Sequence, residues 1–277
     1  MLEQSEASAK AYLCSLKDDT RLPIQISLRC IMQVKNDIQY RGYDCCRLDT
    51  YLPEGDVRAV FLYFHGGSLE AGDKGCASVF VPYLCERGVA FVSANYRMYP
   101  SAKYPDYIVD AAEAVKWSLE YAEGLGCEKI FVGGSSAGAY LSMMLCFDTS
   151  YLKNAGADIS RIAGYFHDAG QPTTHFQIMR ERGLDGLRIA VDGAAPMYYV
   201  GAEKSYPPMR FIVSDNDMKN RYEQTMLMLA ALKNFGHTNF DSVIMHGKHC
   251  EYVRKLDENG ETVFGKMIFD YLTPLEN

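Results

Sequence analysis

The sequence contains no long apolar run, no cluster of basic residues and no pair of cysteines in CxxC spacing. A transmembrane helix needs about 20 consecutive apolar residues, so the lack of such a run predicts no membrane insertion. The formal net charge is −7, which argues against a nucleic acid or an anionic membrane surface as a partner. Neither kind of partner is therefore expected.

The cysteines exclude two further kinds of stabilising site. There are nine, an odd number without CxxC spacing, so neither a disulfide framework nor a zinc site is predicted. Potential metal-ligand types do occur at His167, Asp168 and His175, but their spacing fits no familiar metal site. Free thiols in this number are typical of a reducing compartment, and the N-terminal stretch MLEQSEASAKAYL does not resemble a signal peptide. We expect a cytoplasmic protein that needs no metal.

Apolar runs and amphipathic segments alternate along most of the 277 residues. The segment 57–65 is almost continuously apolar, like a strand buried on both faces, whereas 105–122 carries apolar residues at helical spacing. This alternation predicts an α/β fold with a mostly parallel sheet that is covered by helices on both faces. The first predicted strands have no helix between them, which indicates an antiparallel lead-in. A single domain over residues 1–277 is the simplest organisation.

The predicted elements are as follows. Strands are expected at 23–34, 45–53, 57–65, 89–97, 129–132, 162–167, 210–214 and 242–246. Helices are expected at 78–87, 105–122, 137–147, 221–235 and 261–271.

The stretch 129–140, KIFVGGSSAGAY, contains the pattern GxSxG with Ser136 at its centre. A sharp strand-to-helix turn of this kind holds a serine in strained backbone, with its hydroxyl exposed above the edge of the sheet. The pattern also occurs by chance, and a plain connection between strand and helix is the alternative interpretation. The predicted strand before it and the predicted helix after it favour Ser136 as a nucleophile.

A second motif, His65-Gly66-Gly67-Ser68, follows the apolar run 57–65. Residues without side chains can turn backbone N–H groups toward a carbonyl oxygen. Acyl transfer needs such donors because negative charge builds on that oxygen, and one donor contributes about 10²–10³ in rate. Gly66, Gly67 and Ala137 are the predicted donors of an oxyanion hole. We interpret His65 as a structural histidine that shapes the loop rather than as a base.

The general base and its acid are expected near the end of the chain. His249 follows the last predicted strand, where a loop carries an imidazole over the C-terminal edge of the sheet, and His246 is its competitor. Asp217 is the preferred acid because it lies three residues beyond Ser214, clear of the predicted strand, while Asp215 is the alternative. Both aspartates could instead cap the helix that follows.

The order Ser136, Asp217, His249 is that of the α/β-hydrolases. The chain resembles their esterases, in the branch related to hormone-sensitive lipases and to bacterial acetyl- and feruloyl-type esterases. The resemblance runs from about residue 48 to the C-terminus and rests on the motifs FHGGS (64–68), NYRMYP (95–100), GGSSAG (133–138), SDND (214–217) and GKH (247–249). Two positions depart from the family pattern. Ser68 replaces a frequent third glycine, and Leu69 lies where a tryptophan is often found, which weakens an interpretation as an arylformamidase.

The resemblance implies a serine carboxylesterase for small to medium acyl esters, acetylated or aromatic-acylated sugars among them. In its mechanism His249, oriented by Asp217, takes the proton of Ser136 as the serine attacks the ester carbonyl. No cofactor and no metal is required. An amidase such as an arylformamidase would use the same triad, and a catalytically silent ligand-binding homologue is a further alternative. The oligomeric state stays open, a homo-oligomer included.

The resemblance also implies a small cap inserted at about residues 169–200. This segment could cover the substrate pocket and set specificity, or it could pack on the surface without touching substrate. Ser68, Leu69, His175 and Phe176 are the predicted contacts to a small-molecule ester substrate.

Overall fold

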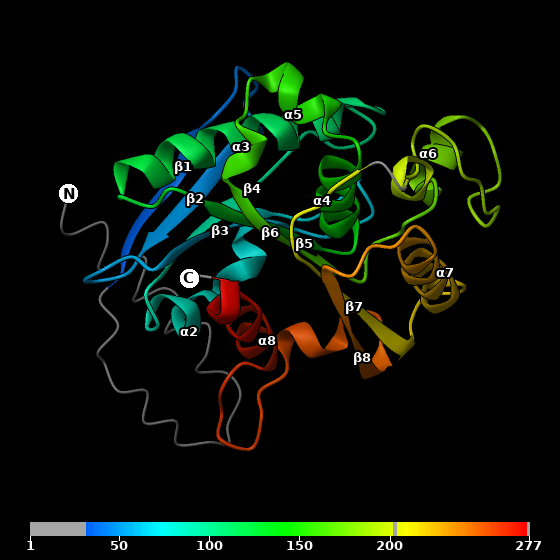
Figure 1. Cartoon of the computed structure of the whole chain (residues 1–277). Coiled ribbons are helices and arrows are strands. Elements are labelled where there is room, and N and C mark those ends of the chain that lie inside the picture. The colour runs from blue at the N-terminus through cyan, green and yellow to red at the C-terminus, as the bar shows by residue number, and fades with distance from the viewer. Residues whose placement is uncertain (1–31, 202–203, 276–277) are drawn as a thin grey trace, which may run out of the picture.

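Eight strands form one sheet in this computed structural model, which describes residues 32–201 and 204–275 (Figure 1). The strands are β1 (Gln33–Gln39), β2 (Arg47–Leu52), β3 (Ala59–Phe64), β4 (Val89–Ala94), β5 (Ile130–Ser135), β6 (Ile162–Asp168), β7 (Met209–Asn216) and β8 (Phe240–Lys248). Their order across the sheet is β1-β2-β4-β3-β5-β6-β7-β8. β1 and β2 pair antiparallel, as do β2 and β4, and all other neighbours are parallel. The predicted mostly parallel sheet with an antiparallel lead-in is confirmed.

Helices cover both faces of this sheet. The α-helices are α2 (Val81–Cys85), α3 (Asp106–Gly124), α4 (Ala137–Phe147), α5 (Ser150–Ala155), α6 (Phe176–Glu181), α7 (Arg221–Asn234) and α8 (Val263–Leu272). Short 3₁₀ turns are η1 (Lys74–Val79), η2 (Ile159–Arg161), η3 (Pro196–Tyr199), η4 (Glu251–Arg254) and η5 (Thr273–Leu275). In Figure 1, α3 and α4 lie on one side of the sheet and α2 and α8 on the other.

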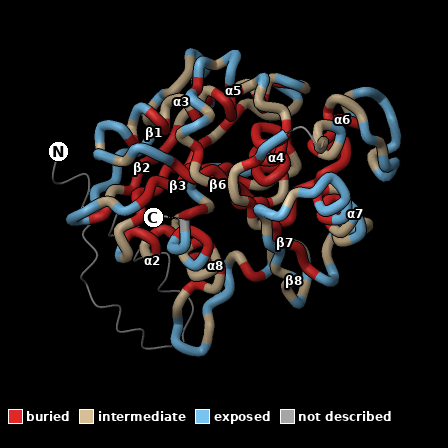
Figure 2. Tube along the Cα trace, viewed as in Figure 1, coloured by how far each residue is buried: buried red, intermediate tan, exposed pale blue. Residues whose placement is uncertain are grey.

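The residues of β3 show why the sheet is buried on both sides. Successive side chains of a strand point to opposite faces. Leu62 and Phe64 belong to the apolar cluster under α3 and α4, whereas Phe61 and Tyr63 belong to the cluster under α2 and α8. Every residue of β3, β4 and β5 is buried, so these central strands read as continuous apolar runs (Figure 2).

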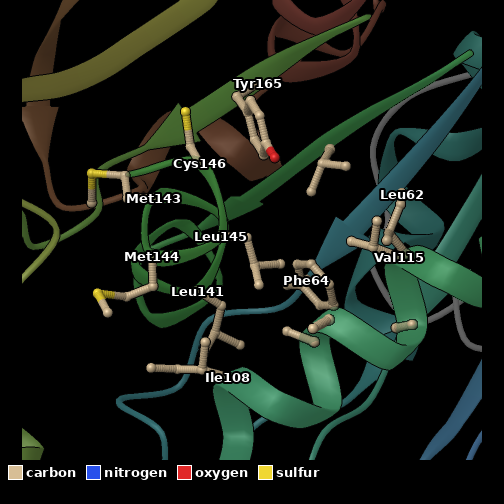
Figure 3. Close-up of a cluster of buried hydrophobic side chains, with 14 of the residues drawn as sticks. Leu62, Phe64, Ile108, Val115, Leu141, Met143, Met144, Leu145, Cys146 and Tyr165 are labelled. Atoms are coloured by element: carbon tan, nitrogen blue, oxygen red, sulfur yellow. The ribbon is translucent and has the colours of Figure 1, made fainter. Parts of the chain in front are cut away.

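Each helix adds apolar side chains to the cluster on its own side. Ile108 of α3, Leu141 of α4 and Met228 of α7 enter one cluster, and Leu84 of α2 and Phe264 of α8 enter the other. Figure 3 shows side chains from the sheet and from α3 and α4 converging in the first cluster. Burial on this scale is the main force that holds the layers together.

Three predicted elements differ from the structure. The expected helix 78–87 is divided into the 3₁₀ turn η1 and the short α2, with Pro82 at the start of α2. The expected strand 23–34 lies almost entirely outside the described residues. The edge strand β1 was not predicted beyond its first two residues, because its sequence QVKNDIQ is polar and mostly exposed.

Two findings bear on membrane and disulfide chemistry. Within 32–201 and 204–275, none of the helices is both long and apolar enough to cross a membrane. Every cysteine in those ranges is a free thiol.

A buried acid, Asp110 of α3, ties the helix to the antiparallel edge of the sheet. Its side chain is fully buried and pairs with Arg41 and Arg97. Arg97 donates from Nε to Oδ2 at 2.8 Å, from Nη2 to Oδ1 at 3.0 Å and from its backbone nitrogen to Oδ2 at 3.0 Å. One carboxylate therefore holds two guanidinium groups from outside the helix.

Replacing Asp110 by asparagine is expected to lower the free energy of unfolding by about 3 kcal/mol, because the two guanidinium groups lose their buried counter-charge. Denaturation in urea, followed by circular dichroism, measures this loss. Asp106→Asn is the matched control, since Asp106 is 46% exposed and lies 3.6 Å from Arg97. The control is expected to lose less than about 1 kcal/mol. If the free energy of unfolding fell equally in the two variants, the buried ion pairs of Asp110 would contribute no more to stability than the exposed pair of Asp106.

Candidate active site

Ser136 lies in the turn between β5 and α4, in backbone that a residue with a side chain rarely adopts. Its φ is 55° and its ψ is −113°. The flanking glycines explain how the turn can be so tight. A Cβ on Gly138 would lie 1.9 Å from the carbonyl oxygen of Phe64, and one on Gly134 would lie 2.5 Å from the carbonyl carbon of Gly138. Only hydrogen fits at either position, so the GxSxG pattern is a packing requirement of this turn.

The side chains of Ser136, His249 and Asp217 form a continuous hydrogen-bonded chain. His249 Nε2 lies 2.8 Å from Ser136 Oγ, and His249 Nδ1 lies 2.6 Å from Asp217 Oδ1. Asp217 follows β7 and His249 follows β8, so all three residues come from the C-terminal ends of strands in the parallel part of the sheet. The structure thus brings together the three residues that the sequence predicts as nucleophile, base and acid.

Asp217 is held as a carboxylate. Burial of its side chain raises the pKa, but the hydrogen bond and the electrostatic interaction with His249 outweigh burial, so the pKa of Asp217 is lowered. The carboxylate also accepts the backbone N–H of Met218 at 2.6 Å and that of Ser214 at 3.3 Å. A carboxylate with this many donors stays ionised and can orient an imidazole.

The competing residues His246 and Asp215 form a separate pair. His246 Nδ1 lies 2.6 Å from Asp215 Oδ2, and the His246 side chain is 94% exposed. The His249 side chain is only 22% exposed and contacts Ser136. The second pair therefore points into solvent and does not take part in the chain that reaches the serine.

The loop after β3 lies directly against Ser136. A Cβ on Gly66 would lie 3.2 Å from Ser136 Cβ, which puts the backbone of this loop in van der Waals reach of the serine. In the described part of the chain, the amides of Gly66, Gly67 and Ala137 donate to no protein acceptor. Free amides around a nucleophile can stabilise a developing oxyanion.

His65 holds this loop from inside the protein. It is fully buried, its ring stacks on Tyr96 with centroids 4.5 Å apart, and Nδ1 donates to the carbonyl oxygen of Gly66 at 2.7 Å. Burial lowers the pKa of His65, so the ring stays neutral. These contacts agree with the structural role predicted for it and leave His249 as the imidazole at the serine.

Asp168 is a further acid beside the site that the sequence did not single out for this chemistry. Its carboxylate accepts hydrogen bonds from Ser135 and Tyr252, and its carbonyl oxygen accepts the N–H of Ser136 at 2.7 Å. Tyr63 donates to Ser135 Oγ at 2.8 Å. Burial raises the pKa of Asp168 to about 6. The signal in the sequence is an acidic residue at the end of an apolar strand, and from residue type alone Asp168 was predicted only as a potential metal ligand.

A sequence model of the family described as alpha/beta hydrolase fold matches residues 61–230, which is more than half of the chain. The chain belongs to the α/β-hydrolase fold family. The matched segment contains Ser136 and Asp217, and the loop with Gly66, while His249 lies beyond its end.

Relatives with curated names align with part of this α/β-hydrolase. Isoprenylcysteine alpha-carbonyl methylesterase of Arabidopsis thaliana is 27% identical over 146 residues, which cover 50% of this chain and 34% of the relative. Ethyl acetate hydrolase of Pseudomonas putida is 33% identical over 94 residues, which cover 31% of this chain and 28% of that protein. The chain thus spans about a third of the length of these curated relatives.

Solved structures share the fold over nearly the whole chain. Esterase B from Lactobacillus rhamnosis has a TM-score of 0.73 at 15% identity, covering 99% of this chain and 93% of that chain. An esterase from Thermogutta terrifontis has a TM-score of 0.69 at 19% identity, covering 88% of this chain and 94% of that chain. At these identities the likeness establishes a common α/β-hydrolase fold.

The four predicted substrate contacts of this α/β-hydrolase differ in their exposure. Leu69 is fully buried in the core, and His175 is buried as the N-cap of α6, where Nδ1 accepts the N–H of Gln177 at 3.2 Å. Neither side chain is open to a substrate, so both predictions are corrected. Ser68 and Phe176 are partly exposed. Burial also lowers the pKa of His175, which remains neutral.

Covalent labelling by a fluorophosphonate tests the chain of contacts at the serine. We expect one label per protein on Ser136, and labelling slowed by about 10³-fold in His249→Ala, because the hydroxyl loses its proton acceptor. His246→Ala is the matched control, since this histidine also pairs with an aspartate but is exposed. The control is expected to be labelled at the wild-type rate, as measured by intact-protein mass spectrometry. Slow labelling of His246→Ala with normal labelling of His249→Ala would reverse the assignment of the base.

Proposed function

We propose that this α/β-hydrolase is a serine carboxylesterase that hydrolyses small to medium acyl esters through an acyl-enzyme on Ser136. The observation that carries the proposal is the unbroken chain from Asp217 through His249 to Ser136, with distances of 2.6 Å and 2.8 Å. These distances fall within the range that proton transfer between a nucleophile and its base requires.

The first half of the reaction forms the acyl-enzyme. Ser136 Oγ attacks the ester carbonyl while His249 Nε2 takes its proton, and the negative charge of Asp217 stabilises the imidazolium that results. The backbone N–H groups of Gly66, Gly67 and Ala137 donate to the oxyanion of the tetrahedral intermediate. Collapse of the intermediate breaks the bond to the alkoxide, which leaves as the alcohol with the proton from His249.

The second half releases the acid. A water molecule gives a proton to His249 and attacks the acyl carbonyl, and the same amides hold the new oxyanion. When this intermediate collapses, Ser136 leaves and recovers its proton from His249. Every step uses groups of this chain and water, so the proposed reaction needs no cofactor.

The names of the relatives support an ester with a small group. Two of them are called a methylesterase and an ethyl acetate hydrolase, and the Thermogutta terrifontis esterase is described with propionate and with butyrate bound. These names support short acyl or alkyl groups as the first substrates to try.

We further propose that the described residues 32–201 and 204–275 form one domain in which segment 169–200 acts as a cap; residues 1–31 of the predicted domain lie outside the described residues. The segment connects β6 to β7 and contains α6 and η3 (Figure 1). Contacts within it support a compact unit. Asp192 accepts a hydrogen bond from Thr174 at 3.0 Å and forms an ion pair with Arg182 at 2.6 Å.

Hydrolysis of p-nitrophenyl acetate, butyrate and octanoate tests the proposal. The wild type is expected to hydrolyse the short esters, and Ser136→Ala is expected to lose about 10³-fold or more in kcat/KM. Ser160→Ala is the matched control because Ser160 is exposed. It precedes β6, whereas Ser136 follows β5, so the two serines lie at opposite ends of parallel strands.

Two outcomes would contradict the esterase proposal. One is equal activity in the wild type and Ser136→Ala, because the reaction would then not pass through this serine. The other is a wild type that hydrolyses none of the esters. Turnover of a formyl anilide by that inactive wild type would assign the same triad to amide hydrolysis.

A further inference from the structure

A cavity of about 240 Å³ lies between the cap segment and the start of α7. Met218, which follows the triad acid Asp217, lines it. Gln171 lines it as well and lies three residues after Asp168, whose carbonyl oxygen accepts the N–H of Ser136. The cavity therefore lies at the same edge of the sheet as the nucleophile.

The lining of this cavity carries a surplus of positive charge. Four of the lining side chains are cationic, namely Arg180, Arg188, Lys219 and Arg221, and one is acidic, Asp185. The whole chain has a formal net charge of −7, so the positive charge of this lining is opposite in sign to that of the protein as a whole. A local field of this sign attracts anions.

Arg221 is the most informative member of the cluster. It is only 3% exposed, and its guanidinium donates to the carbonyl oxygen of Ala169 and to Gln171 Oε1, at 3.3 Å from the latter. Both acceptors are neutral, and within the described ranges no carboxylate forms an ion pair with Arg221. Buried charges are ordinarily paired, as Arg97 is with Asp110.

The other cations of the cavity are also weakly compensated. Arg188 and Lys219 form no ion pair with the described residues. Arg180 lies 3.9 Å from Glu70, and both side chains are more than 40% exposed, so that pair contributes little. Three cationic groups around a buried guanidinium can therefore turn toward a bound anion.

The lining also provides apolar surface beside these charges, from Phe176, Leu187, Ile189 and Met218. Phe176 lies beneath the guanidinium of Arg180, with the carbon of the guanidinium 5.2 Å from the ring centroid. Met218 is 41% exposed. This arrangement suits a ligand that has an apolar connecting group and an anionic end.

We infer that the cavity binds the anionic end of the substrate, so that the substrate class is an ester with a carboxylate or a phosphate remote from the scissile bond. The inference rests on the proposed esterase function, because it extends the substrate from Ser136 into the cavity. Carboxylate and phosphate share the chemistry that Arg and Lys recognise, and separate substrates distinguish them.

Matched esters with and without a charge test the inference. On the acyl side, p-nitrophenyl hydrogen adipate is compared with p-nitrophenyl hexanoate. On the alcohol side, 4-acetoxyphenylacetate and 4-acetoxyphenyl phosphate are compared with methyl 4-acetoxyphenylacetate. We expect kcat/KM for at least one anionic ester to exceed that of its neutral partner by about tenfold, and this ratio to fall toward one in 1 M salt because of screening.

Variants then locate the effect in the cavity. In the double variant Arg188→Gln/Lys219→Gln, the anionic-to-neutral ratio of kcat/KM is expected to fall about fivefold or more. The double variant Lys153→Gln/Lys233→Gln removes the same number of charges from the ends of α5 and α7 and is expected to keep the wild-type ratio. Arg221 is left unchanged, because it also links the cap segment to α7.

The outcomes separate this inference from the proposed function. If neutral esters are hydrolysed but no anionic ester is preferred, or both double variants lower the ratio equally, the cavity does not select anions and the esterase proposal stands. If no ester of either kind is hydrolysed, the esterase proposal is contradicted, and so is the inference that the substrate is an anionic ester. A preference for the phosphate ester alone would assign the cavity to phosphate rather than carboxylate.

Discussion

The close contact between Gly138 and the carbonyl oxygen of Phe64 is the constraint on which the rest of the site depends. It lets α4 begin directly against the end of β3, and no side chain fits between them. The chain must then turn from β5 into α4 within a single residue, and Ser136 adopts a positive φ to do so. Because Gly66 comes two residues after Phe64, the same contact also brings the loop of Gly66 and Gly67 beside Ser136. The positions of Ser136 and of this loop are thus set by one packing requirement.

Asp168 connects the loop after β8, which carries His249, to the turn at Ser136. Its carboxylate accepts a hydrogen bond from Ser135, the residue before Ser136, and another from Tyr252, three residues after His249. Burial makes ionisation of this carboxyl unfavourable, as its raised pKa of about 6 shows. A buried polar group of this kind is tolerated when its hydrogen bonds are satisfied, and here they join the two loops that must stay in register.

Much of the fold was predictable because the central strands are buried on both faces and therefore carry continuous apolar runs. The polar edge strand β1 lacks that signal and was missed. The choice between Asp217 and Asp215 could not be settled from the sequence, because it depends on the end of β7. There the pairing with β8 shifts between Ser214 and Asn216. Asp217 then reaches His249, and Asp215 faces His246.

The wrong substrate contacts have a similar physical origin. Leu69 follows the glycine loop in sequence, but both Ser68 and Leu69 adopt a positive φ, and the chain folds back so that Leu69 enters the core. Serine and leucine rarely adopt a positive φ, which is found mainly in glycine and asparagine, so the sequence does not predict this conformation. A sequence pattern can therefore locate the loop beside the nucleophile without revealing which of its side chains face the substrate.

Charge connects the triad with the proposed anion site. The pKa of Asp217 is lowered in small part by Arg221, so one buried guanidinium lies within electrostatic reach of both Asp217 and the cavity. At physiological salt, charges more than about 8 Å apart are largely screened, so the distant acidic surface of the protein has little effect inside the cavity. An anionic ester would therefore experience the local cations rather than the net charge of −7. On this argument an acidic protein can select an anionic substrate, provided that its cations are gathered where the substrate ends.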